Sequence, residues 1–235
     1  MQGVFDIVNV AGVKEDGDAI FLLLKDIFTG KLKNDLKLLN YYEEMPISYG
    51  NPTIDNCTGG ALELTVHPNQ SVVIELQKQS ILKSSHFPSA LSVHTKVEYA
   101  NSKKNYVVLG RFAYAQVRAE RRAAVRVRMQ DQTSVGIKST TGVSCAARLV
   151  DISVSGVKLL DAQVCSSDLA ECTLVLVLLG ERVTLPATFL RETTNERGHF
   201  LVFTIQPDSR TEVLISKLIY NRQVEIIQTI KDQIM

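Results

Sequence analysis

RAERRAAVRVRM, residues 118–129, divides the chain into two halves of different composition and opens the second half with a cluster of arginines. Up to residue 115 the chain has ten lysines and one arginine, whereas from residue 116 onward it has four lysines and eleven arginines. Five of those arginines fall within the quoted stretch, which we call the arginine arm, and only Glu120 opposes them. The change predicts a domain boundary, with one domain over residues 1–115 and a second, beginning with the arm, over residues 116–235.

Arg122 and Arg126 of the arm stand four residues apart, which puts both side chains on one face of either a strand or a helix. They can therefore act on one ligand. A guanidinium offers paired, planar donors that match a phosphate and the O6 and N7 acceptors of guanine, whereas lysine supplies charge without that fork. Taken alone, an arginine cluster is more typical of a solvated basic strand, and a nonspecific nucleic-acid contact ranks second.

A second polar motif, Asp-Ile-Ser-Val-Ser-Gly, occupies residues 151–156, and it begins 25 residues after Arg126. In an extended segment Asp151 and Ser153 point to the same side, and Gly156 permits a positive φ angle or a close backbone approach. The carboxylate can accept hydrogen bonds from N1 and N2 of guanine, and the hydroxyl both donates and accepts. These residue types are also ordinary in hairpin turns, so the hexapeptide alone favours a structural turn.

Short apolar runs and a terminal amphipathic segment predict the architecture of the second half. Six strands with short turns favour a closed antiparallel barrel, because closure removes exposed strand edges. A helix over residues 209–231 should close against the barrel with its apolar face of Val213, Leu214, Leu218, Val224, Ile227 and Ile230. We expect the strands at residues 125–129, 143–150, 156–160, 173–179, 182–190 and 199–205.

The first half is predicted to begin with a helix within residues 15–39 and then to form a second small β domain. His-Pro-Asn-Gln at residues 67–70 should be the turn of a hairpin. Strands are expected at residues 61–66, 71–76, 90–99 and 106–117. The predicted fold class is therefore mainly β, with two small antiparallel β-barrel domains in tandem, the C-terminal one six-stranded and closed by a terminal helix.

Composition and charge exclude several classes of function. The 26 basic and 25 acidic residues leave a net charge of +1, which offers no global attraction to nucleic acid or to a membrane. The longest apolar runs, residues 19–24 and 174–179, are far shorter than the ~20 residues that a membrane helix needs. The first twelve residues have no basic stretch and lack the features of a secretory signal. We expect a cytoplasmic protein without a membrane span.

The cysteines and histidines indicate neither a metal site nor an active site. No C-x-x-C pair occurs, and no histidine lies at metal-ligand spacing from a cysteine, so the thiols are expected to be buried in a reducing compartment. The four histidines are scattered without a catalytic order, and no glycine-rich phosphate loop or zinc-hydrolase motif appears. The protein is therefore predicted not to be an enzyme. The cysteines are Cys57, Cys145, Cys165 and Cys172.

Together the two motifs resemble the signature of the PilZ domain family, R-x-x-x-R followed by D/N-x-S-x-x-G. Arg122, Arg126, Asp151, Ser153 and Gly156 fill all five positions, and the resemblance covers roughly residues 116–235. It implies a six-stranded barrel whose arginine arm wraps the bacterial second messenger cyclic di-GMP on the barrel surface. It implies no other cofactor. By position and length, the first half is similar to the N-terminal β domain of flagellar-brake type PilZ proteins.

The resemblance makes the five motif residues and Arg121 the candidate cyclic di-GMP ligands, with Arg118 as a further candidate. PilZ proteins vary at the position of Arg121, where an arginine can add a cation over a guanine face. This favours two stacked ligand molecules per chain, although one ligand with Arg121 in solvent stays open. Binding at the arm, between the domains, is expected to change their arrangement and the interaction with a downstream protein. That partner, motility or envelope machinery included, is left open, as is a homodimer.

Two alternative functions remain at this stage. The first is a single-stranded nucleic-acid-binding protein built on a small barrel with a basic arm. Aromatic residues make up only 6% of the chain, which argues against base stacking as its mode of binding. The second is a nucleotide-independent PilZ-like adaptor that contacts a protein partner. Titration with cyclic di-GMP beside an RNA oligomer separates the receptor from the first alternative, and mutation of Arg126 separates it from the second.

Overall fold

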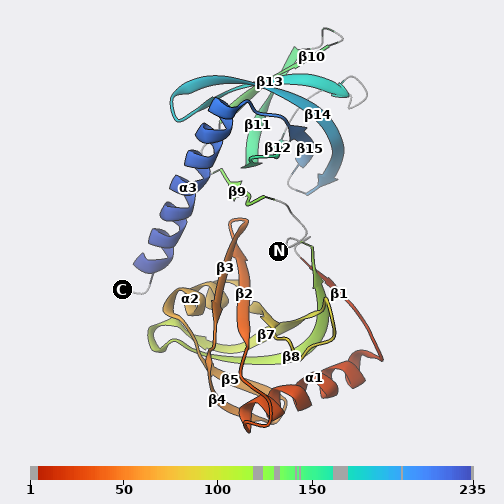
Figure 1. Cartoon of the computed structure of the whole chain (residues 1–235), viewed down its shortest axis with the longest axis vertical. Coiled ribbons are helices and arrows are strands. Elements are labelled where there is room, and N and C mark those ends of the chain that lie inside the picture. Colours follow the sequence, from red (N-terminus) through yellow and green to blue (C-terminus); the bar gives the residue numbers. More distant parts are fainter. Residues whose placement is uncertain are drawn as a thin grey trace. The chain divides into compact units, whose positions relative to one another are not determined.

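The computed structural model describes residues 5–118, 124–129, 133–140, 142, 144–160, 169–196 and 198–233. Its internal contacts divide the chain into two compact units, which are described separately below (Figure 1). The first unit comprises Met1–Tyr42, Pro46–Ala123 and Ile226–Met235, and the second comprises Glu43–Met45 and Ala124–Glu225.

The second unit contains a closed antiparallel barrel of six strands, as predicted. The strands pair in the order β10–β13–β14–β15–β12–β11, and β10 also pairs with β11, which completes the ring. A short strand, β9, pairs with β11 outside this ring. The bounds are β9 Val127–Arg128, β10 Ser134–Ser139, β11 Ser144–Ser153, β12 Gly156–Leu160, β13 Glu171–Leu178, β14 Glu181–Asn195 and β15 Gly198–Ile205.

One of the expected strands differs from the structure, and one strand of the ring was not expected. Residues 125–129 were expected to form a full barrel strand, but only Val127 and Arg128 are extended, and they lie outside the ring. The sixth strand is instead β10, which the sequence analysis missed. Val135 and Ile137 of β10 face the barrel core at the two-residue spacing of a strand. Gly136 lies between them, and a glycine inside such a short strand weakens the sequence pattern by which the strand is predicted.

Helix α3, Ser209–Asp232, follows the last strand and closes the barrel, as predicted. Ile215 and Ile219 belong to the barrel core, and the Asp208 carboxylate accepts a hydrogen bond of 2.7 Å from the N–H of Thr211, one of the unpaired donors of the first turn. The predicted apolar face matches the buried one in part: Leu214 and Leu218 pack against the barrel core, and Ile230 is buried. Val213 and Val224 are 67% and 51% exposed, because the burial stripe passes through Ile215 and Ile219 and each residue turns the helix by about 100°.

The first unit is built on an antiparallel sheet, which confirms the second β domain. Its described pairings follow the path β3–β2–β6–β7–β8–β5–β4, and β1 pairs with β8. The path is open, without the ring closure that the second unit has. The bounds are β1 Phe5–Ile7, β2 Lys37–Tyr42, β3 Met45–Gly50, β4 Thr53–Thr58, β5 Ala61–Thr65, β6 Gln79–Lys83, β7 Ser92–Asn101 and β8 Tyr106–Val117.

Two α-helices and a 3-10 turn, η1 at Ser102–Lys104, accompany this sheet. Helix α1, Val13–Phe28, packs Ile20 and Leu24 into a core that includes Leu62 and Leu109 of the sheet. Among the described residues, no helix of either unit is long and apolar enough to cross a membrane.

The second helix, α2 at Pro68–Gln77, overturns the hairpin expected at residues 67–76. Pro68 occupies the first turn, and the Nδ1 atom of His67 accepts the N–H of Asn69 at 3.2 Å, so the segment carries helix-start chemistry. Lys78 then ends the helix in the left-handed conformation. The run Ser71–Ile74 is buried on every side, and such a short buried run cannot be assigned to helix or strand by periodicity alone.

Candidate ligand-binding site

The pairing of β9 with β11 brings the end of the arginine arm against the second motif. Val127 lies opposite Ile152, and Arg128 lies opposite Asp151. The N–H of Met129 also donates to the carbonyl of Val150 at 2.9 Å, which extends the attachment by one residue. Because Arg126 directly precedes β9, this register fixes its backbone beside the strand that carries Asp151.

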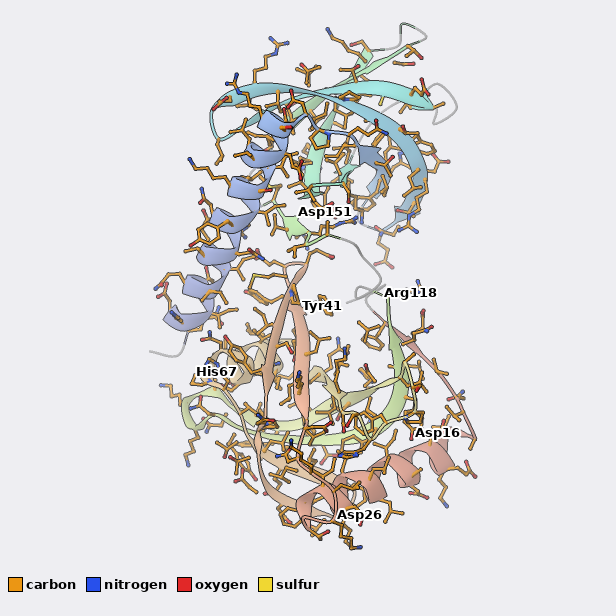
Figure 2. The ribbon with its side chains drawn as sticks, viewed as in Figure 1. Asp16, Asp26, Tyr41, His67, Arg118 and Asp151 are labelled. Atoms are coloured by element: carbon orange, nitrogen blue, oxygen red, sulfur yellow. The ribbon has the colours of Figure 1, made fainter. Side chains whose placement is uncertain are left out.

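Arg126 and Asp151 form an ion pair, with 3.3 Å between Nε of the arginine and Oδ1 of the aspartate. The Asp151 side chain is 7% exposed and that of Arg126 is 23% exposed (Figure 2 labels Asp151). At such burial water screens the two charges poorly, so each strongly favours a partner of opposite charge. The ion pair therefore holds a guanidinium and a carboxylate, the two groups suited to phosphate and guanine recognition, in one place.

Ser153 and Gly156 form the two ends of a tight hairpin between β11 and β12. They lie opposite each other in register, and Val154 and Ser155 form the connecting turn. The Ser153 hydroxyl donates to the carbonyl of Gly156 at 3.1 Å, and the N–H of Ile205 donates to the carbonyl of Ser155 at 3.1 Å. These bonds tie the turn to itself and to β15, so it presents a fixed backbone beside Asp151.

Gly156 is required by close packing and not by a left-handed backbone. Its φ lies outside the positive range, but a Cβ atom at this position would lie 3.0 Å from the carbonyl oxygen of Phe203 on β15. The sequence left both reasons open, and the structure favours the close approach. The missing side chain allows β12 and β15 to pair at the base of the hairpin.

Of the remaining candidate arginines, the structure describes Arg118 alone. Arg118, labelled in Figure 2, belongs to the first unit, where its Nε and Nη2 atoms donate to the carboxylate of Asp6 on β1. Arg121 and Arg122 lie outside the described residues, so their part in the site stays a prediction. Within the second unit, the described site is therefore made by Arg126, the β11–β12 hairpin and the strands around it.

The sequence analysis missed Lys158, which lies directly opposite Asp151 across β11 and β12. Its ammonium Nζ lies 4.2 Å from the ring centroid of Phe200. A signal for this neighbour was present in the sequence. A two-residue turn at residues 154–155 makes Ser153 pair with Gly156. Two residues before Ser153 on β11 is Asp151, and two residues after Gly156 on β12 is Lys158, so these two residues also lie opposite each other.

The described residues contain no group of three or more histidine, cysteine, aspartate or glutamate side chains that could hold a metal ion. Of the cysteines, Cys57, Cys145 and Cys172 are free thiols, whereas Cys165 lies outside the described residues. Burial, and to a smaller extent neighbouring Cys145, raises the pKa of the Cys172 thiol to about 11. A thiol with such a pKa carries little thiolate at neutral pH and is a poor nucleophile.

No protein-family model and no curated protein matches the chain. Solved structures do. MrkH from K. pneumonia, in its complex with c-di-GMP, is 10% identical with a TM-score of 0.45 over 96% of this chain and 99% of that one. YcgR from Escherichia coli, in complex with c-di-GMP, is 13% identical with a TM-score of 0.42 over 93% and 95%. The Bacillus subtilis inhibitor of motility MotI is 13% identical with a TM-score of 0.38 over 82% and 97%. At these values, function has to be inferred from this chain's own residues.

Proposed function

We propose that this chain is a receptor of the PilZ class that binds cyclic di-GMP and carries out no chemical reaction. The observation that carries the proposal is the Arg126–Asp151 ion pair beside the Ser153–Gly156 hairpin. A guanidinium suits phosphate oxygens and guanine O6 and N7, and a carboxylate suits guanine N1–H and N2–H. Both groups of the pair thus match cyclic di-GMP, which has two phosphates and two guanines.

Binding replaces the ion pair with contacts to the ligand. A guanine edge donates to Asp151, and the Arg126 guanidinium turns to the phosphate or to the Hoogsteen edge of a base. In the complex, the guanine donors take the place of Arg126 and compensate the charge of Asp151. The buried carboxylate therefore does not lose its hydrogen-bonding partner when the ligand binds. In this proposal Arg122 adds a second guanidinium, with paired donors, on the same face of the arm. Arg121 stacks over a guanine and favours the binding of a second ligand molecule. Arg118 is a further ligand contact.

Ligand binding is coupled to the rest of the chain through the arm. We take residues 116–235 as the receptor domain and residues 1–115 as the domain that responds to it. When the ligand holds the arm, fewer arrangements of the two domains are accessible. The ligand binds the protein more tightly in these arrangements than in the others, and this difference in affinity drives the change. The altered arrangement is then recognised by a downstream protein. The free thiols of Cys57, Cys145 and Cys172 support a location in the reducing cytoplasm.

The test is calorimetric titration of the full chain with cyclic di-GMP and, in parallel, with a single-stranded RNA oligomer. We expect saturable binding of the dinucleotide and an affinity loss of about tenfold or more for Arg126→Lys, because a charge-assisted, forked contact contributes about 1.5–3 kcal/mol. Arg182→Lys on exposed β14 is the matched control and should bind as the wild type does. Tighter binding of RNA, or no binding of cyclic di-GMP by the wild type, would refute the proposal.

A further inference from the structure

Four residues from four neighbouring strands form a line on the barrel, and two of them are basic. Asp151 on β11 lies opposite Lys158 on β12, Lys158 lies opposite Val202 on β15, and Val202 lies opposite Arg191 on β14. Residues directly opposite each other in antiparallel strands point to the same face of the sheet. We name Asp151, Lys158, Val202 and Arg191 the outer row.

The outer row faces away from the barrel core. Leu159, Leu201 and Phe203, which alternate with members of the row, belong to the core cluster. Side chains along a strand point alternately to opposite faces, so Lys158 and Val202 point outward. On the outside of the barrel, the candidate carboxylate therefore continues into a row with two basic side chains: Arg191 is exposed and Lys158 is half-buried, whereas Asp151 and Val202 are 5% and 6% exposed.

The position of Lys158 on this surface is fixed by its neighbour Phe200. The ammonium lies 4.2 Å above the phenyl ring, within the range of a cation–π interaction. Phe200 is 5% exposed and is not part of the barrel core, so the lysine lies against an apolar group on the outside of the barrel. This contact restrains a long, flexible side chain and holds its charge against β15, the strand next to β12 in the row.

The spacing of the outer row suits a ligand with two phosphates. Neighbouring strands of a sheet lie about 4.8 Å apart. The backbone of Lys158 is therefore about 5 Å from that of Asp151 on the neighbouring strand, and the backbone of Arg191, two strands further on, is about 10 Å from that of Lys158. Asp151 provides the acceptor for a guanine edge, and the two cations provide charge for phosphate oxygens. Arg126, paired with Asp151, supplies a further donor at the same end of the row.

We propose that the outer row extends the nucleotide site across β12 and β15, with Lys158 and Arg191 binding the phosphate groups of cyclic di-GMP while Asp151 binds a guanine. This inference rests on the proposed function and adds two ligand residues that lie outside the R-x-x-x-R and D-x-S-x-x-G motifs. The Phe200 ring orients Lys158 for this contact, so Lys158 is a ligand residue and Phe200 is a positioning residue.

The experiment measures cyclic di-GMP affinity of the full chain by calorimetry at low and high salt. Lys158→Met keeps an aliphatic side chain on Phe200 and removes only the charge, whereas Lys158→Arg keeps the charge. Arg191→Gln tests the other cation. The matched control is Lys138→Met, since Lys138 is an exposed lysine opposite Ser144, at the end of β11 remote from Asp151.

We expect Lys158→Met and Arg191→Gln each to lower the affinity about tenfold at low salt, with a smaller loss at high salt where charges are screened. Lys158→Arg should restore most of the affinity, and Lys138→Met should match the wild type. All variants should keep the wild-type melting temperature within a few degrees, because none removes a core side chain.

Two results would overturn the inference while the proposed function stands. In the first, the wild type binds and Arg126→Lys loses affinity, but Lys158→Met and Arg191→Gln bind as tightly as the wild type. In the second, Lys158→Met melts at a much lower temperature and Lys158→Arg restores that temperature without restoring affinity, which would give the lysine a purely structural role. Absence of binding by the wild type would refute both the inference and the proposed function.

Discussion

Replacement of Gly156 by alanine tests what the motif glycine does, because two opposing effects on stability can be weighed from the structure. The added Cβ would lie 3.0 Å from the carbonyl oxygen of Phe203, a backbone atom of β15 that cannot rotate away. Overpacking of this kind costs about 1–3 kcal/mol. Since φ is not positive, alanine also restricts the unfolded chain and returns about 0.4–1 kcal/mol. The net expectation is a loss of about 1 kcal/mol in the free energy of unfolding.

Gly136→Ala on β10 is the matched control for this prediction. Its Cβ would lie 3.7 Å from the nearest atom, the carbonyl oxygen of Val175, which is an ordinary contact, and its φ is likewise not positive. Alanine there should stabilise the barrel by about 0.4–1 kcal/mol. In urea unfolding of the full chain, the two substitutions should change the free energy of unfolding in opposite directions, and in thermal unfolding Gly156→Ala should lower the melting temperature by roughly 2–4 °C. If both variants were as stable as the wild type, the close-packing explanation for Gly156 would be wrong.

Three further predictions concern ligand specificity and pH. Asp151→Ala should weaken cyclic di-GMP more than cyclic di-AMP, because adenine lacks the paired N1 and N2 donors of guanine, and an equal loss for both in calorimetry would limit Asp151 to a structural role. Asp208→Ala should lower stability in urea through loss of the bond to Thr211, and less at low pH. Hydrogen bonds from the Thr211 side chain and N–H lower the pKa of Asp208. The contribution of Asp208 to stability is therefore complete above its pKa in the unfolded chain and is lost as the pH falls through its pKa in the folded chain. Equal effects of the substitution at pH 2 and pH 7 would contradict this. Burial raises the pKa of Asp35, but hydrogen bonds from Ser84 and Ser85 outweigh this and lower it to about 2, so carboxyl NMR should find it ionised at pH 3, and a midpoint near 4 would refute the assignment.

Local patterns predicted two strands with the bounds that the structure has. Residues 106–117 and 156–160 were expected to be strands, and β8 and β12 have those bounds. The segment at residues 68–77 failed, because Ser71–Ile74 is buried all round and its β-branched valines favour a strand, whereas Pro68 and His67 start a helix. The physical reason is that capping chemistry outweighed residue propensity at this position.

The site shows a similar division between local and long-range information. Spacing alone placed Asp151 and Ser153 near Gly156, since all three lie within one hairpin. The contact of Arg126 with Asp151 depends on the register of β9 against β11, which joins residues far apart in sequence, and no local pattern contains it. The line from Lys158 to Arg191 likewise crosses three strands whose register only the folded barrel determines.

The most direct test of the central claim is a titration of the 15N-labelled full chain with cyclic di-GMP, followed through the backbone amide signals. The claim predicts saturable shifts at Val127 and Arg128 on β9 and along residues 151–158, where the arm meets the β11–β12 hairpin. Signals of Lys138 and Ser144, which pair at the end of β11 remote from Asp151, are the internal reference within the same barrel. An unchanged spectrum, or shifts that leave residues 151–158 untouched, would contradict the claim.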